Sequence, residues 1–478
     1  MKQILLPLPR IIVCVFLFSL LYWSYLALNT RMSISCDSIG YEALGRLIQE
    51  HGFLPAYFKN NEPNREPLYP LLVSSSMYLE RILGMGYTKI MAAYGVLILL
   101  MTQILIYIVM RLLNIRTGVC ALALAYMGIS PALNNTAFSL YSEIATYPFI
   151  LLLILLNARA YQTIREGTIK DSLRIGFYLG LIFLAVTFIK AVFELVFFIL
   201  CAAYVCILAA SLFQRKNAIA LNCLIVLVIF AASYQAPVLA YKSLNKKYND
   251  HFVLTNRGSW ALYGSCAVRA EKLTVERFLT AAASVPGRGF CEQTFGKEKC
   301  FFWGTEQSDL LGDTKLVEIS RHTPASMVDQ RMLELAKEKA MKNPAQFILL
   351  MGLDGLKMFF WESTQIGFVA YPPWMERMYH ITLFKNGLRM LVSLLSLGGF
   401  LYLGVFIFKN FTAFLNGRAS SPRIITGSFM FLIIAGYVGL HSLFNTVPRW
   451  ALPLAPLYII TIGIMLDGMV PDRRKPQK

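Results

Sequence analysis

The stretch from Cys36 to Gly52 contains the first side chains whose types and spacing could do chemistry. Asp37 comes soon after the first long apolar run of the chain, and Tyr41 follows about one helical turn later. A carboxylate held at the boundary between lipid and water can accept a proton from a hydroxyl or an amine. Aspartate is equally a favoured N-cap, and Gly52 is a suitable stop for the helix that would follow. From these residues alone, helix capping is the simpler interpretation of Asp37.

A second candidate is the charged pair Arg65-Glu66, which is followed directly by Pro67-Leu68-Tyr69. The fork of an arginine guanidinium matches the oxygens of a phosphate, so Arg65 could bind one. In the alternative interpretation the two charges form a solvated loop pair that contributes very little to stability. The local sequence does not decide between these two interpretations.

Three further sites bring charge into apolar surroundings, where an ionisable group is costly and is by default a functional candidate. The first is Ser142-Glu143, where the serine could cap a helix that carries the glutamate in its first turn. The second is Lys190 with Glu194, which are also spaced for an i,i+4 ion pair. The third is Arg449, which could simply extend to the lipid head groups. Taken singly, each site is explained by structure at least as well as by function.

The composition indicates that membrane helices position these side chains. Of the 478 residues, 56% are hydrophobic and 15% are charged, whereas about a quarter of the residues of soluble proteins are charged. Lysine and arginine outnumber aspartate and glutamate by 45 to 27, which gives a net charge of +18. The basic residues gather mainly at the ends of apolar runs, so the excess does not require a nucleic-acid partner.

We expect an all-α polytopic membrane protein with about ten transmembrane helices, because that many apolar runs are long enough to cross a bilayer. These runs are Ile11–Leu28, Ile90–Met110, Gly118–Leu133, Tyr141–Leu156, Ile175–Ile189, Ala191–Leu212, Ala218–Tyr241, Met390–Phe408, Ile424–Leu440 and Ala451–Leu466.

The distribution of basic residues predicts the topology. If the N-terminus is cytoplasmic, the cytoplasmic connections and the C-terminal tail hold an excess of arginine and lysine, as the positive-inside rule expects. Both termini are then cytoplasmic. Residues 1–242 form a transmembrane core with an outer loop at 29–89, residues 243–385 form an extracytoplasmic region, and residues 386–478 form the C-terminal transmembrane helices and a basic tail.

We expect the two outer regions to combine amphipathic helices with mixed or irregular structure. Apolar residues recur at helical spacing after Asp37, which predicts a helix on the membrane surface. Residues 329–342 read as a helix that ends at Asn343-Pro344, because proline disfavours helix at the residue before it. Residues 346–360 are apolar but carry two charges, and counting them as a span would break the positive-inside pattern, so we expect an interfacial helix there.

Cysteine and histidine give weaker signals. Cys291 and Cys300 fall in the outer region and close a short loop, which makes a disulfide plausible and a zinc site the weaker option. The histidines show none of the spacings of known metal motifs, so scattered structural histidines are the better interpretation. They are His51, His251, His322, His380 and His441.

In their order and shared sidedness, these motifs resemble those of the GT-C superfamily of polyprenyl-phosphate-dependent glycosyltransferases. The resemblance is strongest to the branch that includes lipid A aminoarabinose transferases and protein O-mannosyltransferases, and it covers most of the chain outside residues 245–321. The motifs that carry it are Asp37 with Tyr41, Arg65-Glu66-Pro67-Leu68-Tyr69, Leu140-Tyr141-Ser142-Glu143, Thr187-Phe188-Ile189-Lys190, Asn343-Pro344 and Pro448-Arg449-Trp450-Ala451-Leu452-Pro453-Leu454.

The resemblance implies an inverting enzyme that moves a hexose or pentose from a polyprenyl-phosphate donor to a lipid, glycan or protein acceptor. The reaction would take place on the outer face of a bacterial inner membrane, among membrane lipids and without nucleic acid. Asp37 would act as the base, and the donor phosphate would bind Arg65, Lys190 and Arg449. Acceptor or metal contacts would come from Glu66, Glu143, Tyr41 and Tyr69, and a divalent cation, Mg²⁺ or Mn²⁺, is compatible with the family.

Two other classes of protein compete with this interpretation. A transporter or flippase would place charges or broken helices near the bilayer midplane in two related halves, whereas the candidate charges here fall at one face. A polysaccharide polymerase or ligase would share the many spans and the large outer loop, and only the Asp37 and Arg65 motifs argue against it. A non-catalytic scaffold is the third alternative.

Overall fold

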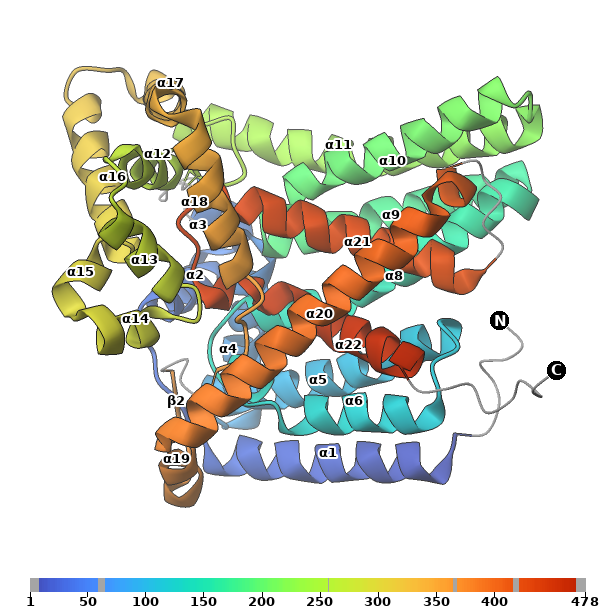
Figure 1. Ribbon diagram of the computed structural model, residues 1–478, viewed down its shortest axis with the longest axis horizontal. Helices are drawn as coiled ribbons and strands as arrows, with labels where there is room; N and C mark the ends of the chain where they lie inside the picture. Colours follow the sequence, from blue (N-terminus) through green and yellow to red (C-terminus); the bar gives the residue numbers. More distant parts are fainter. Residues whose placement is uncertain (1–7, 59–64, 257, 364–367, 416–420, 470–478) are drawn as a thin grey trace.

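The computed structural model describes residues 8–58, 65–256, 258–363, 368–415 and 421–469, and these are almost entirely helical. Figure 1 shows the arrangement. The first half contains α1 (Arg10–Asn29), β1 (Arg31–Met32), α2 (Asp37–His51), α3 (Phe53–Phe58), α4 (Leu68–Leu83), α5 (Tyr87–Leu112), α6 (Thr117–Ile129), α7 (Pro131–Ala137), α8 (Glu143–Glu166), α9 (Ile169–Ile189), α10 (Phe193–Phe213) and α11 (Asn217–Asn249). The second half contains α12 (Gly258–Ala270), α13 (Val275–Ala283), α14 (Arg288–Phe295), α15 (Lys297–Phe301), α16 (Thr305–Ser320), α17 (Ala325–Lys342), α18 (Pro344–Lys357), β2 (Val369–Ala370), α19 (Pro373–His380), α20 (Thr382–Leu415), α21 (Pro422–His441), the 3-10 helix η2 (Pro448–Leu454) and α22 (Ala455–Met469).

The membrane-spanning part agrees with the expected all-α polytopic fold. Nine helices of the described chain are long and apolar enough to cross a membrane, and the bent pair α6 and α7 makes up to ten. The bend of 52° interrupts the third expected span. It occurs at Ser130-Pro131, because proline has no amide hydrogen to donate and disfavours helix at the residue before it. The predicted cytoplasmic ends, residues 1–7 and the basic tail 470–478, lie outside the described residues.

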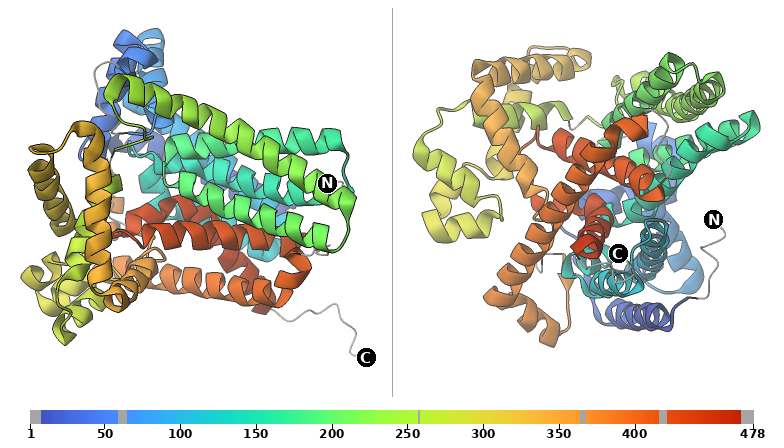
Figure 2. Two further views of the ribbon diagram at one scale, coloured as in Figure 1. Left: turned by 90° about the horizontal axis from the view of Figure 1, so that it is seen from above. Right: turned by 45° about the vertical axis from the view of Figure 1, so that its right-hand side comes forward.

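The spanning helices run side by side, and the polar segments gather at one end of their bundle (Figures 1 and 2). This polar end, defined by α2–α4 and α12–α18, is where α1 finishes and α22 begins. The span that holds α8 and the span that holds η2 and α22 are the most enclosed, with 72% of each apolar window buried, against 22% for α1. Side chains at the polar ends of these two spans are therefore held by a rigid surrounding core.

Helix α2 lies across the polar end and packs on α4 through Ser38, Tyr41, Gly45 and Ile48. Gly45 permits this close approach, since a Cβ there would lie 2.8 Å from a methyl of Val73. The helix predicted after Asp37 is thus present. The face that packs on α4 overlaps only in part with the apolar stripe predicted to lie on the membrane: Ile48 belongs to both, whereas Ile39 and Ala43 stay exposed. The contact with α4, rather than lipid alone, determines which face is covered.

Residues 243–385, for which the sequence predicted mixed or irregular structure, are mostly helical. The α12–α18 helices form a small bundle in which α12 packs on α16 and α17. Cys291 and Cys300 are joined in a disulfide that ties α14 to α15. Helix α17 ends before Asn343, whose side chain accepts a hydrogen bond from the Gln346 amide and caps α18. The only sheet in the described chain is a two-residue antiparallel ladder, in which Arg31 pairs with Ala370 and Met32 with Val369.

Candidate functional site

The carboxylate of Asp37 lies between two guanidinium groups. Nη2 of Arg65 donates to Oδ1 of Asp37 at 2.8 Å, and Nη2 of Arg449 donates to Oδ2 of the same residue. Burial alone would raise the pKa of Asp37, but Arg449 and Arg65 outweigh it and hold the pKa well below its usual range. Asp37 opens α2, where an acid is favoured by the helix dipole, but a helix start does not require two arginines. Capping therefore does not account for the whole environment of Asp37.

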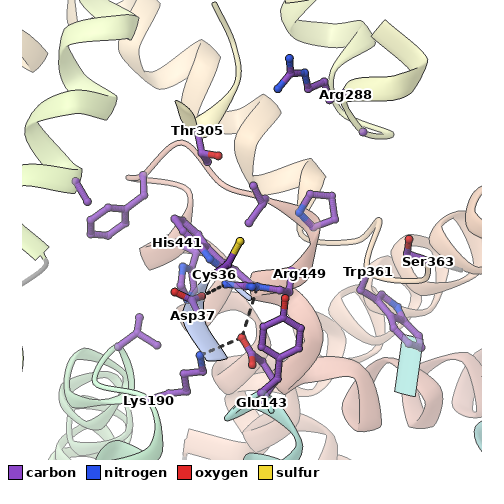
Figure 3. Close-up of a pocket in the computed structure, with 18 of the residues that line it drawn as sticks. Cys36, Asp37, Glu143, Lys190, Arg288, Thr305, Trp361, Ser363, His441 and Arg449 are labelled. Carbon is purple, nitrogen blue, oxygen red and sulfur yellow. Dashed lines mark hydrogen bonds and ion pairs between the residues drawn. The ribbon is translucent and has the colours of Figure 1, made fainter. Parts of the chain in front are cut away.

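Arg449 connects Asp37 to a second carboxylate. Its guanidinium lies over the ring of Tyr141, 4.5 Å from the ring centre, and its Nε is 3.9 Å from Oε1 of Glu143. The same oxygen of Glu143 accepts a hydrogen bond from Nζ of Lys190 at 3.0 Å. Figure 3 shows these ion pairs as one connected chain. Arg449 thus pairs with carboxylates inside the protein. The alternative interpretation, in which it extends to the lipid head groups, does not describe its contacts.

Lys190 lies in the short break between α9 and α10, which brings its side chain to Glu143 at the start of α8. Glu194 pairs instead with Lys242 of α11, so the i,i+4 pair considered from the sequence is not formed. The Glu143 side chain is only 2% exposed. A charge this deeply buried is stable only with close partners, which Lys190 and Arg449 supply.

The other predicted residues surround this cluster. Glu66 accepts a hydrogen bond from the Ala191 amide at 3.0 Å and so holds the backbone beside Lys190. The hydroxyl groups of Tyr41 and Ser142 are 3.0 Å apart, and the rings of Tyr41 and Tyr69 meet edge to face with centres 4.9 Å apart. Tyr41 and Tyr69 therefore pack next to the cluster and help to position it.

A cavity of about 1130 Å³ opens beside the cluster. Asp37, Glu66, Glu143, Lys190 and Arg449 line it, whereas Arg65, Tyr41 and Tyr69 do not. Arg65 packs over the Tyr41 ring, 4.9 Å from its centre, and donates to Asp37 without lining the cavity itself. The volume lies just above the range of about 300 to 1,000 Å³ that is usual for sites of small organic ligands.

The far side of the cavity contains residues that sequence reasoning missed. Arg288 of the α12–α18 bundle lies on the wall opposite Asp37 (Figure 3). Arg389 of α20 also lines it and donates to the Pro286 carbonyl at 3.0 Å and to the Ser363 hydroxyl at 2.8 Å. His441, interpreted from the sequence as structural, lines the cavity beside Arg449. The sequence feature that could have indicated a place at the cavity is its position eight residues before Arg449.

The α12–α18 bundle also holds the segment that leads to Arg449. Arg269 of α12 is 2% exposed and donates to the carbonyl oxygens of residues 442–444 at 2.6 to 2.8 Å. It also donates to Asp354 of α18 at 2.6 Å. Asn445 follows, and its amide donates to the Ser265 hydroxyl at 2.8 Å. The bundle thus fixes the approach of the chain to the site.

The arrangement combines three carboxylates with three cations in a buried cluster that borders a large cavity. Such a site can orient a nucleophile and neutralise charge that develops on a leaving group. Among the described residues, no group of three or more His, Cys, Asp or Glu side chains is placed to hold a metal ion, so we derive no metal-dependent step. No protein-family model matches the sequence, and no curated protein matches it at a significant level.

Proposed function

We propose that this protein is a glycosyltransferase that moves a sugar from a polyprenyl phosphate to a lipid, glycan or protein acceptor, as its resemblance to the GT-C superfamily implies. The observation that carries the proposal is the position of Asp37. It borders the cavity, and its carboxylate is paired with Arg449, a cation that borders the same cavity. This pairing supports the proposal that Asp37 is the base and Arg449 the neighbouring phosphate-binding group.

The proposed reaction exchanges one bond at the anomeric carbon. The acceptor oxygen or nitrogen attacks that carbon from the face opposite the phosphate, and the bond from the carbon to the phosphate oxygen breaks with inversion. The acceptor proton passes to Asp37. The polyprenyl phosphate leaves with one negative charge more than the phosphodiester donor carried, so groups that stabilise the developing charge accelerate the step.

Arg449 and Lys190 are the cations we assign to that charge, because both line the cavity. In the structure their charges are matched by Asp37 and Glu143. As the leaving phosphate gains charge, it competes with Asp37 for Arg449. Weaker pairing raises the proton affinity of Asp37 at the moment when the acceptor proton must be taken up. We assign Arg65 a positioning role, since it contacts Asp37 from outside the cavity.

We further propose that the polar end of the bundle faces the outside of a bacterial inner membrane, with both termini in the cytoplasm. The support is the excess of basic residues in the connections at the other end. The lipid tail of the donor would lie among membrane lipids, and its head group would enter the cavity from the side.

The test of this function is the release of free polyprenyl phosphate. Purified protein is incubated with a panel of undecaprenyl-phosphate-linked sugars and a membrane extract from the host that supplies acceptors. The proposal expects release with at least one donor, and release that depends on the extract. A folded protein that releases no lipid phosphate from any donor would favour a transporter or a polymerase.

A further inference from the structure

We infer that His441, with the rings of Tyr437 and Trp450, forms a binding site for the hydroxyl groups and ring of the transferred sugar. This inference rests on the proposed function and assigns the part of the cavity that adjoins the phosphate-binding cations. His441 ends α21 and lines the cavity, as do both aromatic residues. Figure 3 shows His441 among the residues that line the cavity, together with Asp37 and Arg449.

The hydrogen bonding of His441 is incomplete in the structure. Both ring nitrogens, Nδ1 and Nε2, are buried and have no hydrogen-bond partner among the described residues. A buried polar group without a partner costs free energy comparable to a lost hydrogen bond, and such groups are rare in folded proteins. A histidine that served only packing would be replaced by an apolar side chain at no loss. Two unpaired nitrogens on a residue that lines the cavity are therefore candidates for hydrogen bonds with a ligand.

Aromatic rings flank the imidazole on two sides. The ring centre of Tyr437 lies 4.5 Å from that of His441, and the ring centre of Trp450 lies 5.5 Å away. The Tyr437 hydroxyl donates to the Trp450 carbonyl at 3.0 Å, and Tyr437 is only 1% exposed, so it is the partly exposed Trp450 that offers an aromatic surface to the cavity. Apolar walls with a few well-placed polar atoms are typical of sites that bind small organic ligands.

Two neighbouring polar atoms indicate the chemical class of the ligand. Oε2 of Glu143 and Nε of Arg449 are also buried without a hydrogen-bond partner among the described residues. The first can only accept and the second can only donate, while a neutral imidazole has one donor and one acceptor. An anion would satisfy only the donors. A neutral ligand with several hydroxyl groups satisfies both kinds, because each hydroxyl can donate and accept.

The test compares the binding of two lipids to purified full-length protein. One is bare undecaprenyl phosphate, and the other is undecaprenyl phosphate linked to glucose, mannose, galactose or arabinose in turn. The variant is His441→Phe, and His322→Phe is the matched control, since His322 is exposed and does not line the cavity. We expect wild type to bind at least one sugar-linked lipid more tightly than the bare lipid.

In His441→Phe the affinity for that sugar-linked lipid should fall about tenfold, with the affinity for the bare lipid unchanged. The thermal stability of the ligand-free variant should stay the same or rise, because an unpaired buried polar group has been removed. If His441 had only a structural role, His441→Phe would instead be less stable, and its affinities for both lipids would be unchanged. His441→Gln, which keeps a donor and an acceptor, should regain part of the lost affinity.

Two outcomes would overturn the inference while leaving the proposed function intact. The first is equal loss of affinity for the bare and the sugar-linked lipid, and the second is a ligand-free His441→Phe protein that is less stable with unchanged affinities. If wild type binds neither kind of lipid, the proposed function itself fails and this inference fails with it.

Discussion

Asp37 and Arg449 are separated by 412 positions in the chain, yet their side chains form a hydrogen-bonded ion pair at the edge of the cavity. The first residue opens a surface helix, and the second lies in the 3-10 helix before the last span. Their meeting joins the two ends of the sequence at one site. It also places a carboxylate where the charge of a bound phosphate would change its proton affinity.

The buried pair of Lys190 and Glu143 gives a test of the cluster itself. Lys190→Met leaves Glu143 buried without its closest cation, so we expect the free energy of unfolding to fall by about 3 kcal/mol. Adding Glu143→Gln should restore most of that loss, because no unpaired charge then remains. Unfolding in detergent by titration with a denaturing surfactant measures both variants.

The matched control for this cycle is Lys246→Met, which breaks an exposed pair with Asp250 and should change stability very little. If the double variant is as unstable as Lys190→Met alone, the destabilisation does not come from an unpaired Glu143, and the electrostatic account of the cluster is wrong.

The low pKa of Asp37 predicts how its contribution to stability depends on pH. Burial opposes ionisation of Asp37, but Arg449 and Arg65 outweigh it, so the folded-state pKa lies below the unfolded value of about 4. A depressed pKa contributes stability above the unfolded value, and that contribution is lost as the pH falls further. The difference in melting temperature between wild type and Asp37→Asn should therefore be constant from about pH 8 to about pH 5. It should shrink below about pH 4, and a difference that already shrinks near neutral pH would contradict the assignment.

Arg269 predicts a mechanical link between the α12–α18 bundle and the site. Arg269→Gln removes the charge that binds the carbonyl oxygens of residues 442–444, so this segment and the following residues should loosen. We expect faster amide hydrogen exchange over residues 442–449, together with slower release of lipid phosphate. The control is Arg331→Gln, an exposed arginine of the same bundle. Unchanged exchange in the Arg269 variant would show that the bundle does not hold the segment.

The sequence predicted the spans well because membrane crossing leaves a strong signal. A run of apolar residues of sufficient length reports a helix without any knowledge of its neighbours. The break at Pro131 was not foreseen, although its residues were visible, because the apolar run continues through it. Within residues 243–385 the helices expected at 329–342 and 346–360 are present as α17 and α18, and the helical character of the remainder was missed for a different reason. Their helices are short and α16 is weakly amphipathic, so their stability depends on packing within the bundle.

The site was predictable only in part. Charged residues in apolar surroundings drew attention to Glu143, Lys190 and Arg449, since such positions are costly, and Asp37 was noted for its place after the first apolar run, although the local sequence favoured a helix cap. Their partners were not predictable, because Lys190 pairs with Glu143 of another helix rather than with Glu194 of its own segment. The roles proposed for Arg65 and His441 depend on whether each side chain lines the cavity. His441 lines it and Arg65 does not, and only the folded structure shows this.

The most direct test of the account is the release of free polyprenyl phosphate by wild type and by Asp37→Asn, measured with the same donor panel and membrane extract. Asparagine keeps the shape of aspartate but cannot take up the acceptor proton. The account predicts release by wild type and a loss of at least about a hundredfold in a variant that folds normally and still binds the donor. Release at an undiminished rate by Asp37→Asn would show that Asp37 is not the base, and would contradict the central claim.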